Sequence, residues 1–245
     1  MYRLLAALMV FVATSTFADE VRMAFGEKIP PFCFPETNSG IEIEVIAEAL
    51  AVGGGHRLKP IYYPFARVPV AFKAGEVDAA MTDLGEDMQP HGGHYGDPAV
   101  FYDNVFITLR SRGLQIRRPE DLKGLSVIAF QGADKRYPEW LGPVKQAGNY
   151  HEQNDQSLQV RMLNDGRYDV VLSDRSIFRY FSLQLARSGG FTPQPVQAHM
   201  FTIARPQDYR PVFRSARVRD DFNAGLAQLK KSGRYKAIYD KYLKD

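Results

Sequence analysis

Two segments of the chain end in the same pair of polar residues, a hydroxyl side chain followed by an aspartate. Residues 72–83 read FKAGEVDAAMTD and residues 163–174 read LNDGRYDVVLSD, so each combines a helix end, a glycine, an aspartate, three apolar residues and the polar pair. Hydroxyl and carboxylate oxygens are hydrogen-bonding groups, and a carboxylate suits a cationic ligand group. Thr82, Asp83, Ser173 and Asp174 are therefore candidate binding residues.

A second pair of segments recurs in the same order along the chain. Residues 23–26 read MAFG, and residues 128–132 read IAFQG. Chance similarity between short α/β units is the alternative, but the ordered recurrence of both pieces favours two similar α/β lobes. Ligands of open α/β sheets bind beyond the carboxyl ends of the strands, and a cleft between lobes is a preferred small-molecule site. The residues expected at this cleft are Phe25, Gly26, Thr82 and Asp83 from the first lobe, and Gln131, Gly132, Ser173 and Asp174 from the second.

The elements that must position these residues alternate between strands and helices. Apolar runs predict strands at 21–25, 57–62, 78–82, 104–110, 126–130, 170–173 and 200–204. Helical spacing predicts helices at 41–52, 66–74, 119–122, 135–141, 157–163, 177–187 and 217–242, the last broken at Gly233. Strand–helix–strand order indicates an α/β fold with parallel strands.

Composition narrows the function classes. The chain has 245 residues, of which 45% are hydrophobic and 24% charged, with a formal charge of +3. This is typical of a globular protein and excludes a disordered, collagen-like or coiled-coil chain. The basic excess is small and no lysine or arginine run stands out, so no nucleic-acid partner is expected. The arginine-rich segment 205–219 is interpreted as a solvated face, with docking to a membrane partner as the alternative.

The first 18 residues resemble a targeting segment. Arg3 precedes an apolar stretch at 4–12, and Thr16 and Ala18 place small residues before a cleavage point. This three-part pattern predicts a secretory signal cleaved after Ala18, and the apolar stretch is too short to favour a membrane anchor. The only cysteine, Cys33, lies well past that point, so we interpret it as a small apolar filler and not a lipid-attachment site.

Several segments together resemble the bacterial family-3 extracellular solute-binding proteins, the amino-acid-type periplasmic binding proteins of ABC importers. After the signal they are Pro30-Pro31-Phe32, the helix at 41, residues 72–78, Gly96-Asp97-Pro98, residues 119–124, residues 169–174 and the tail at 226–242. The resemblance covers essentially the whole chain after residue 18, and it depends on the order and spacing of these segments. No single one is diagnostic.

The resemblance implies a two-lobed α/β fold of the type II periplasmic-binding-protein kind, with a hinge of two crossing strands. Residues 19–109 and 201–245 would form lobe 1, and residues 110–200 would form lobe 2. It also implies a periplasmic monomer without a cofactor, which traps a small polar solute by hinge closure and delivers it to an ABC permease in the inner membrane.

The expected site departs from the family pattern. Family members that bind amino acids usually carry an arginine in the loop after the first Gly-x-x-Asp strand, where it pairs with the ligand carboxylate. Here the loop at 82–91 has three acids and no arginine, and the second carboxylate pocket reads Gly132-Ala133-Asp134, without its usual hydroxyls. Asp174 is retained where the family holds the ligand ammonium group.

Two further residues complete the expected site. Arg67 begins a helix expected to face the cleft and could replace the missing arginine; otherwise it is a surface residue. Phe32 follows two prolines and could stack on the ligand, although Phe34 or a core role for both rings is the alternative. The expected ligand-binding residues are Phe32, Arg67, Thr82, Asp83, Gly132 and Asp174.

The leading function is a solute receptor and not an enzyme. The alternative is a periplasmic enzyme on the same fold, such as a dehydratase of cyclic dienyl acids with Glu86 or Asp87 as the acid, or a sensory or orphan receptor. His91 and His94 flank two glycines that give no rigid ligand face, so no metal is expected. If Arg67 reaches the cleft, an amino acid or small acid should bind; if not, a neutral or cationic solute is favoured.

Overall fold

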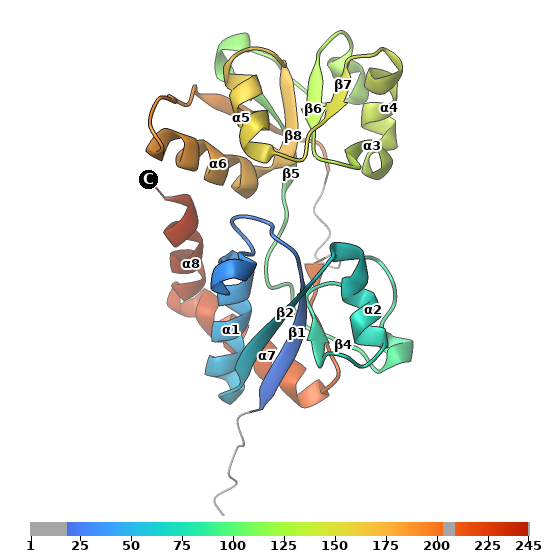
Figure 1. Ribbon diagram of the computed structural model, residues 1–245, viewed down its shortest axis with the longest axis vertical. Helices are drawn as coiled ribbons and strands as arrows, with labels where there is room; N and C mark the ends of the chain where they lie inside the picture. Colours follow the sequence, from blue (N-terminus) through green and yellow to red (C-terminus); the bar gives the residue numbers. More distant parts are fainter. Residues whose placement is uncertain (1–18, 203–208, 245) are drawn as a thin grey trace, which may run out of the picture.

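The computed structural model describes residues 19–202 and 209–244. These residues form two α/β lobes, each built on a five-stranded sheet. The chain passes from the first sheet to the second between β4 and β5 and returns between β9 and β10 (Figure 1). The predicted two-lobed α/β fold is therefore confirmed.

The sheet of lobe 1 has the strand order β2-β1-β3-β10-β4. Its strands are β1 (Glu20–Gly26), β2 (Arg57–Tyr63), β3 (Ala79–Ala80), β4 (His94–Tyr95) and β10 (Val212–Phe213), and its helices are α1 (Ile41–Gly54), α2 (Val68–Lys73), α7 (Ala216–Ser232) and α8 (Arg234–Leu243). Strands β1, β2 and β3 are parallel, whereas β10 runs antiparallel to its neighbours. Helices α1 and α7 lie so close that a Cβ atom at Gly225 would stand 1.9 Å from the carbonyl oxygen of Ala49, which requires glycine there.

The sheet of lobe 2 has the order β7-β6-β8-β5-β9. Its strands are β5 (Asn104–Leu109), β6 (Val127–Ala129), β7 (Tyr150–Glu152), β8 (Val170–Asp174) and β9 (Val196–Met200), and its helices are α3 (Ala133–Arg136), α4 (Pro138–Gln146), α5 (Gln156–Asn164) and α6 (Arg175–Arg187). Short 3₁₀ helices occur at Pro35–Thr37, Phe65–Arg67, Gln89–His91, Arg110–Arg112 and Pro119–Leu122. Separate apolar clusters form the cores of lobe 2, while one larger cluster fills lobe 1.

Two predicted boundaries are wrong. Strand β5 pairs with β8 and β9, so the sheet of lobe 2 begins at Asn104 and the proposed end of the first part of lobe 1 at residue 109 falls too late. The strand expected to begin at Met200 begins instead at Val196, as β9 (Val196–Met200), because it pairs antiparallel with β5 from Val105 to Leu109; positions 203 and 204 of the expected strand lie outside the described residues. The predicted break at Gly233 is confirmed, since this glycine separates α7 from α8.

Within residues 19–202 and 209–244, no helix combines the length and apolarity needed to cross a lipid bilayer. The predicted signal at 1–18 lies outside the described residues.

Candidate binding site between the lobes

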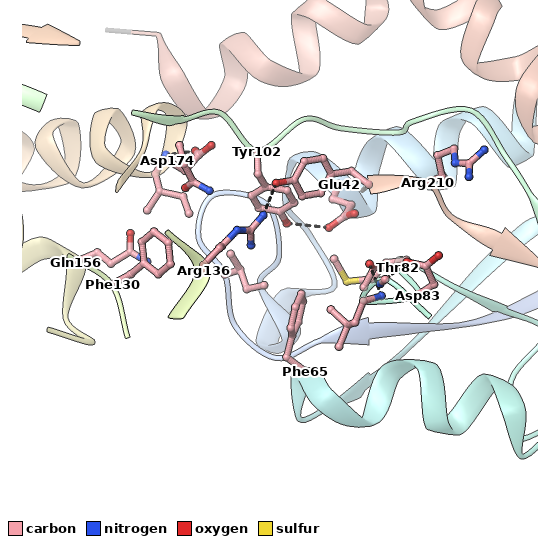
Figure 2. Close-up of a pocket in the computed structure, with 17 residues that line it drawn as sticks. Glu42, Phe65, Thr82, Asp83, Tyr102, Phe130, Arg136, Gln156, Asp174 and Arg210 are labelled. Atoms are coloured by element: carbon pink, nitrogen blue, oxygen red, sulfur yellow. Dashed lines mark hydrogen bonds between the residues drawn. The ribbon is translucent and has the colours of Figure 1, made fainter. Parts of the chain in front are cut away.

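A cavity of about 650 Å³ lies where the two lobes face each other. Figure 2 shows side chains of lobe 2 on one side of it and side chains of lobe 1 on the other, with Glu42 and Tyr102 between them. The charged residues that line it are Glu42, Asp83, Arg136, Asp174 and Arg210, and the aromatic ones are Phe65, Tyr102, Phe130 and Tyr209. A concave site with an apolar wall and a few charged groups is suited to a small solute.

Asp174 lines the cavity as predicted, but its carboxylate also has a structural task. It ends β8 and is the N-cap of α6, where Oδ1 accepts hydrogen bonds from the backbone amides of Ser176 and Ile177, each at 2.9 Å. Oδ2 accepts a third bond, from the amide of Asp103 at 2.6 Å. Burial raises the pKa of this carboxyl to about 7. Asp174 therefore ties lobe 2 to the segment that leads into it, and each oxygen keeps limited capacity for a ligand.

Thr82 and Asp83 also line the cavity, at the carboxyl end of β3. Thr82 Oγ1 accepts from the amide of Leu84 at 3.1 Å, and Asp83 Oδ1 accepts from the amide of Gly85 at 2.9 Å. Asp83 Oδ2 accepts from the Tyr95 hydroxyl at 2.7 Å. Both side chains therefore shape the loop after β3 while they face the cavity.

Arg67 does not line the cavity. Its guanidinium donates to Glu76 at 2.9 Å, and half of its side chain is exposed. The short 3₁₀ helix after β2 instead places Phe65 at the cavity, with 44% of its surface exposed. The expectation that Arg67 replaces the missing arginine is therefore not met by this geometry, and its alternative as a surface residue describes it.

Phe32 and Gly132 are also absent from the lining of the cavity. Phe32 is fully buried, and its ring centroid is 4.4 Å from that of Tyr102, so it is a core aromatic. The amide of Gly132 donates to Glu152 Oε2 at 3.0 Å, so the protein's own carboxylate occupies the donor expected to face a ligand. Four other residues expected at the cleft are absent from its lining: Phe25, Gly26, Gln131 and Ser173.

Two arginines at the cavity were missed by the sequence reasoning. Arg136 belongs to α3 and donates to the Tyr209 hydroxyl at 2.9 Å. The guanidinium of Arg210 lies 4.6 Å from the ring centroid of Tyr95, and its buried Nε has no hydrogen-bond partner among the described residues. The start of α3 at the carboxyl end of β6 was a usable signal for Arg136. No comparable sequence signal pointed to Arg210, because it lies in the arginine-rich segment that was interpreted as a solvated face.

Glu42 is the third missed residue. It is the second residue of α1 and only 2% exposed, and its Oε2 accepts from the Tyr102 hydroxyl at 3.2 Å. Burial raises the pKa of its carboxyl to about 8. A charged residue on the apolar face of a predicted helix was the available signal, because buried charges are rare without a partner.

The acids suggested for an enzyme lie outside this cavity. Glu86 pairs with Lys73 at 2.5 Å, and Asp87 accepts from the amide of Gln89 at 2.9 Å. Across the described part of the chain, no group of three or more histidine, cysteine, aspartate or glutamate residues is arranged to hold a metal ion.

Comparisons with known proteins agree with this architecture. No family model and no curated protein matches the chain. The substrate-binding domain 2 of GlnP from Lactococcus lactis, in an open conformation, is 23% identical with a TM-score of 0.65, and the match covers 94% of this chain and 97% of that one. The ancestral amino-acid-binding protein AncCDT-1, a precursor of cyclohexadienyl dehydratase, is 20% identical with a TM-score of 0.61, covering 92% and 96%. A histidine kinase sensor domain similar to periplasmic binding proteins is 20% identical with a TM-score of 0.59, covering 92% and 96%.

These structural similarities identify the fold of the chain. The chain has the two-lobed fold of the amino-acid-type solute-binding proteins, as the resemblance predicted, and its cavity lies between the lobes.

Proposed function

We propose that this protein is a periplasmic solute-binding protein that traps a small polar solute, an amino acid or an amine-like molecule, between its lobes for an ABC importer. The observation that carries the proposal is the interlobe cavity, where acidic, basic and aromatic side chains from both lobes converge. Export through the predicted signal at 1–18 and delivery to a permease of the inner membrane are parts of the same proposal.

The charges at the cavity favour a solute that carries both signs. Arg136 and Arg210 can pair with a carboxylate, while Glu42 and Asp174 can pair with an ammonium group. The sequence had pointed to Arg67 as the one cation available for an acid. With Arg67 bound to Glu76, the two cavity arginines take that role, so an amino-acid-like solute remains compatible with the acidic loop.

A thermal-shift panel of amino acids, amines and dicarboxylates on residues 19–245 tests the proposal. A solute at 100 times its Kd should stabilise the native state by about 2.7 kcal/mol. Arg210→Ala should weaken the binding of carboxylate-bearing solutes, whereas the matched control Arg67→Ala should bind them as the wild type does. No shift with any member, or equal loss in both variants, would contradict the proposed site.

A dehydratase-like enzyme is the second candidate, and one observation favours it. A carboxyl whose pKa is about 8, as burial makes that of Glu42, is protonated at neutral pH and could act as a general acid in the cavity. Incubation with a cyclic dienyl acid that carries a ring hydroxyl tests this candidate. The ring carboxylate would leave as carbon dioxide, its electron pair would make the ring aromatic, and the hydroxyl would leave as water with the proton of Glu42, so the product would absorb in the ultraviolet. Turnover abolished in Glu42→Gln would support the enzyme; absence of turnover would exclude this substrate class.

A further inference from the structure

Asp19, the residue before β1, is held through its backbone nitrogen, its carbonyl oxygen and its carboxylate. The nitrogen donates to His56 Nδ1 at 3.3 Å, and the carbonyl accepts from the amide of Arg57 at 3.0 Å. The carboxylate Oδ2 accepts from the guanidinium of Arg217 on α7 at 2.5 Å. Groups from the start of β2 and from α7 therefore bind this one residue at three separate points.

His56 is the buried centre of this contact. Its side chain is fully buried, and its Nε2 lies 2.9 Å from Asp221 Oδ2 on α7. Because Nδ1 accepts a hydrogen bond from Asp19, the proton of the neutral ring is on Nε2 and is donated to Asp221. The imidazole therefore connects a carboxylate to the nitrogen of Asp19, and none of these three residues lines the interlobe cavity.

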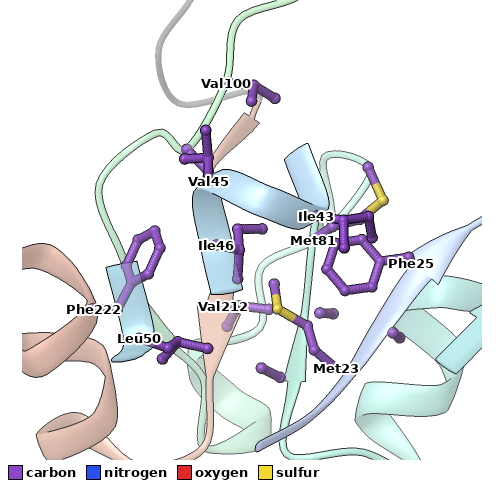
Figure 3. Close-up of a cluster of buried hydrophobic side chains, with 14 of the residues drawn as sticks. Met23, Phe25, Ile43, Val45, Ile46, Leu50, Met81, Val100, Val212 and Phe222 are labelled. Atoms are coloured by element: carbon purple, nitrogen blue, oxygen red, sulfur yellow. The ribbon is translucent and has the colours of Figure 1, made fainter. Parts of the chain in front are cut away.

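The close packing of α1 against α7 fixes the position of the His56–Asp221 pair. A Cβ atom at Gly54 would stand 2.4 Å from His56 Nε2 and 2.8 Å from Asp221 Oδ2. A Cβ atom at Gly53 would stand 1.8 Å from the carbonyl oxygen of Asp221. Phe222, which follows Asp221 on α7, belongs to the buried core of lobe 1 (Figure 3). The pair therefore depends on two glycines and on the core, and has little freedom to move away from Asp19.

The charges around the Asp19 nitrogen favour a positive group at this atom. The Asp19 carboxylate is paired with Arg217, and Arg57 on β2 is paired with Glu20 on β1. Among the described residues, the Asp221 carboxylate pairs with the neutral imidazole and with no lysine or arginine. An ammonium group on the other side of the ring would therefore be stabilised by Asp221 through the imidazole.

The same residue follows the predicted cleavage point. The pattern at residues 1–18 predicts cleavage after Ala18, which makes Asp19 the first residue of the exported chain. We infer that His56, Asp221 and Arg217 form a binding site for the α-ammonium group and the carboxylate of an N-terminal Asp19. The inference rests on the export that is part of the proposed function, and it adds a site remote from the solute.

Cleavage changes the group that this site receives. Water hydrolyses the peptide bond between Ala18 and Asp19: its oxygen bonds to the carbonyl carbon of Ala18, which becomes a carboxylate. Both protons of the water go to the nitrogen of Asp19, which becomes an ammonium group at neutral pH. An ammonium group donates a charge-assisted hydrogen bond to His56, which is stronger than the bond from a neutral amide. The site therefore binds the cleaved chain more tightly than the uncleaved one.

Export of the full chain from a Gram-negative host, followed by intact-mass measurement, tests the cleavage point. The exported protein should have the mass of residues 19–245. Acylation with an amine-reactive ester at pH 7, followed by peptide mass mapping, then measures how well the amine is protected. The Asp19 amine should react at least about tenfold more slowly in the folded protein than in a peptide of residues 19–26, as a rise of one unit in its pKa implies.

Variants assign this protection to the site. His56→Phe should raise the acylation rate to that of the peptide, because the acceptor is lost. His199→Phe is the matched control: His199 is also buried, lies in lobe 2 and bonds to Thr108, so its loss should leave the protection unchanged. Asp221→Asn, which keeps the imidazole and removes the charge behind it, is the second variant should His56→Phe fail to fold, and it should lose part of the protection.

The outcomes separate the inference from the proposed function. A first residue other than Asp19 overturns the inference, as does an amine that reacts as fast in the folded wild type as in the peptide. Full protection in folded His56→Phe or folded Asp221→Asn overturns it as well. All three results leave solute binding, which the thermal-shift panel measures, intact. A chain that is not exported overturns both the inference and the periplasmic location in the proposed function.

Discussion

The two lobes contain the same sequence unit and use its two aspartates differently. The inner aspartate, which precedes the three apolar residues of the unit, has the same role in both lobes. Asp78 accepts a hydrogen bond from the amide of Arg22 at 3.0 Å, and Asp169 accepts one from the amide of Ser126 at 2.9 Å. Each bond joins the start of one parallel strand to the start of the next, β1 to β3 and β6 to β8. The repeated aspartate therefore belongs to the sheet and not to the cleft.

The outer aspartates, Asp83 and Asp174, which end the two units, have different roles. Asp83 holds a loop and the Tyr95 hydroxyl, whereas Asp174 caps the 13-residue helix α6 and binds the segment between the lobes. The repeated unit therefore determines how each sheet is built, while the chemistry of the cleft comes largely from residues outside this unit.

Among the single substitutions, those at Asp174 should change stability and solute affinity most. Asp174→Ala removes three hydrogen bonds from buried amides and the cap of α6, so the free energy of unfolding should fall by about 3 kcal/mol. Solute affinity should also fall, by on the order of 2 kcal/mol. Asp174→Asn keeps an acceptor for the cap, so it should retain most of the stability and still lose affinity. Chemical denaturation and calorimetry measure the two effects; unchanged affinity in both folded variants would remove Asp174 from the site.

The raised pKa values of Asp174 and Glu42 predict how stability depends on pH. Burial raises these pKa values to about 7 and about 8, above ordinary values of 3.8 and 4.5, so the folded state binds these protons more tightly than the unfolded state does. This contribution is complete below the unfolded pKa values and is lost as the pH rises through 7 and 8. Between pH 6.5 and 8 the free energy of unfolding should fall by on the order of 2 kcal/mol.

The double variant Glu42→Gln with Asp174→Asn is the control for this pH dependence. Its unfolding free energy should be flatter over the same range, measured by urea denaturation at each pH. A wild-type curve that is already flat would show that these two carboxyls do not titrate as their burial implies.

Replacement of the inner aspartates, Asp78 and Asp169, should lower the free energy of unfolding by different amounts. Asp169 is 19% exposed at its side chain and also binds the Ser126 hydroxyl and Arg112, whereas Asp78 is 39% exposed and binds Arg22. Asp169→Ala should therefore cost about 2 kcal/mol and Asp78→Ala about 1 kcal/mol, because solvent screens the more exposed pair. Equal losses in denaturant unfolding would weaken the claim that burial sets the difference between the lobes.

The smallest effect is expected at Arg67. Its pair with Glu76 is on the surface, so Arg67→Ala should change stability by less than about 0.5 kcal/mol. Solute affinity should not change, because the side chain does not reach the cavity. A large loss of affinity would restore Arg67 to the site.

Periodicity predicted the fold better than it predicted the site. Strand–helix alternation and the break at Gly233 depend on local patterns, so α1, β5 and β8 could be placed closely from the sequence. The lobe boundary was missed because antiparallel pairing of β5 with β9 joins residues about 90 positions apart, which no local pattern encodes.

The site was predicted in part, for a physical reason. Thr82, Asp83 and Asp174 reach the cavity because they follow strands whose carboxyl ends face it. Arg210 and Tyr102 reach it from the segments that join the lobes, whose direction is set by tertiary packing. Arg67 does not reach the cavity, because the 3₁₀ turn after β2 places the side chain of Phe65 there instead.

Capture of the solute between the lobes should shorten the distance from one lobe to the other, and this distance can be measured. Spin labels on cysteines placed at Val70 of α2 and Lys135 of α3, in a Cys33→Ala background, report on the two sides of the cleft. Pulsed electron resonance should show a single shift to shorter distances when the tightest-binding solute of the panel is added, and no shift with that solute in Arg210→Ala. Saturating binding with an unchanged distance would contradict capture between the lobes.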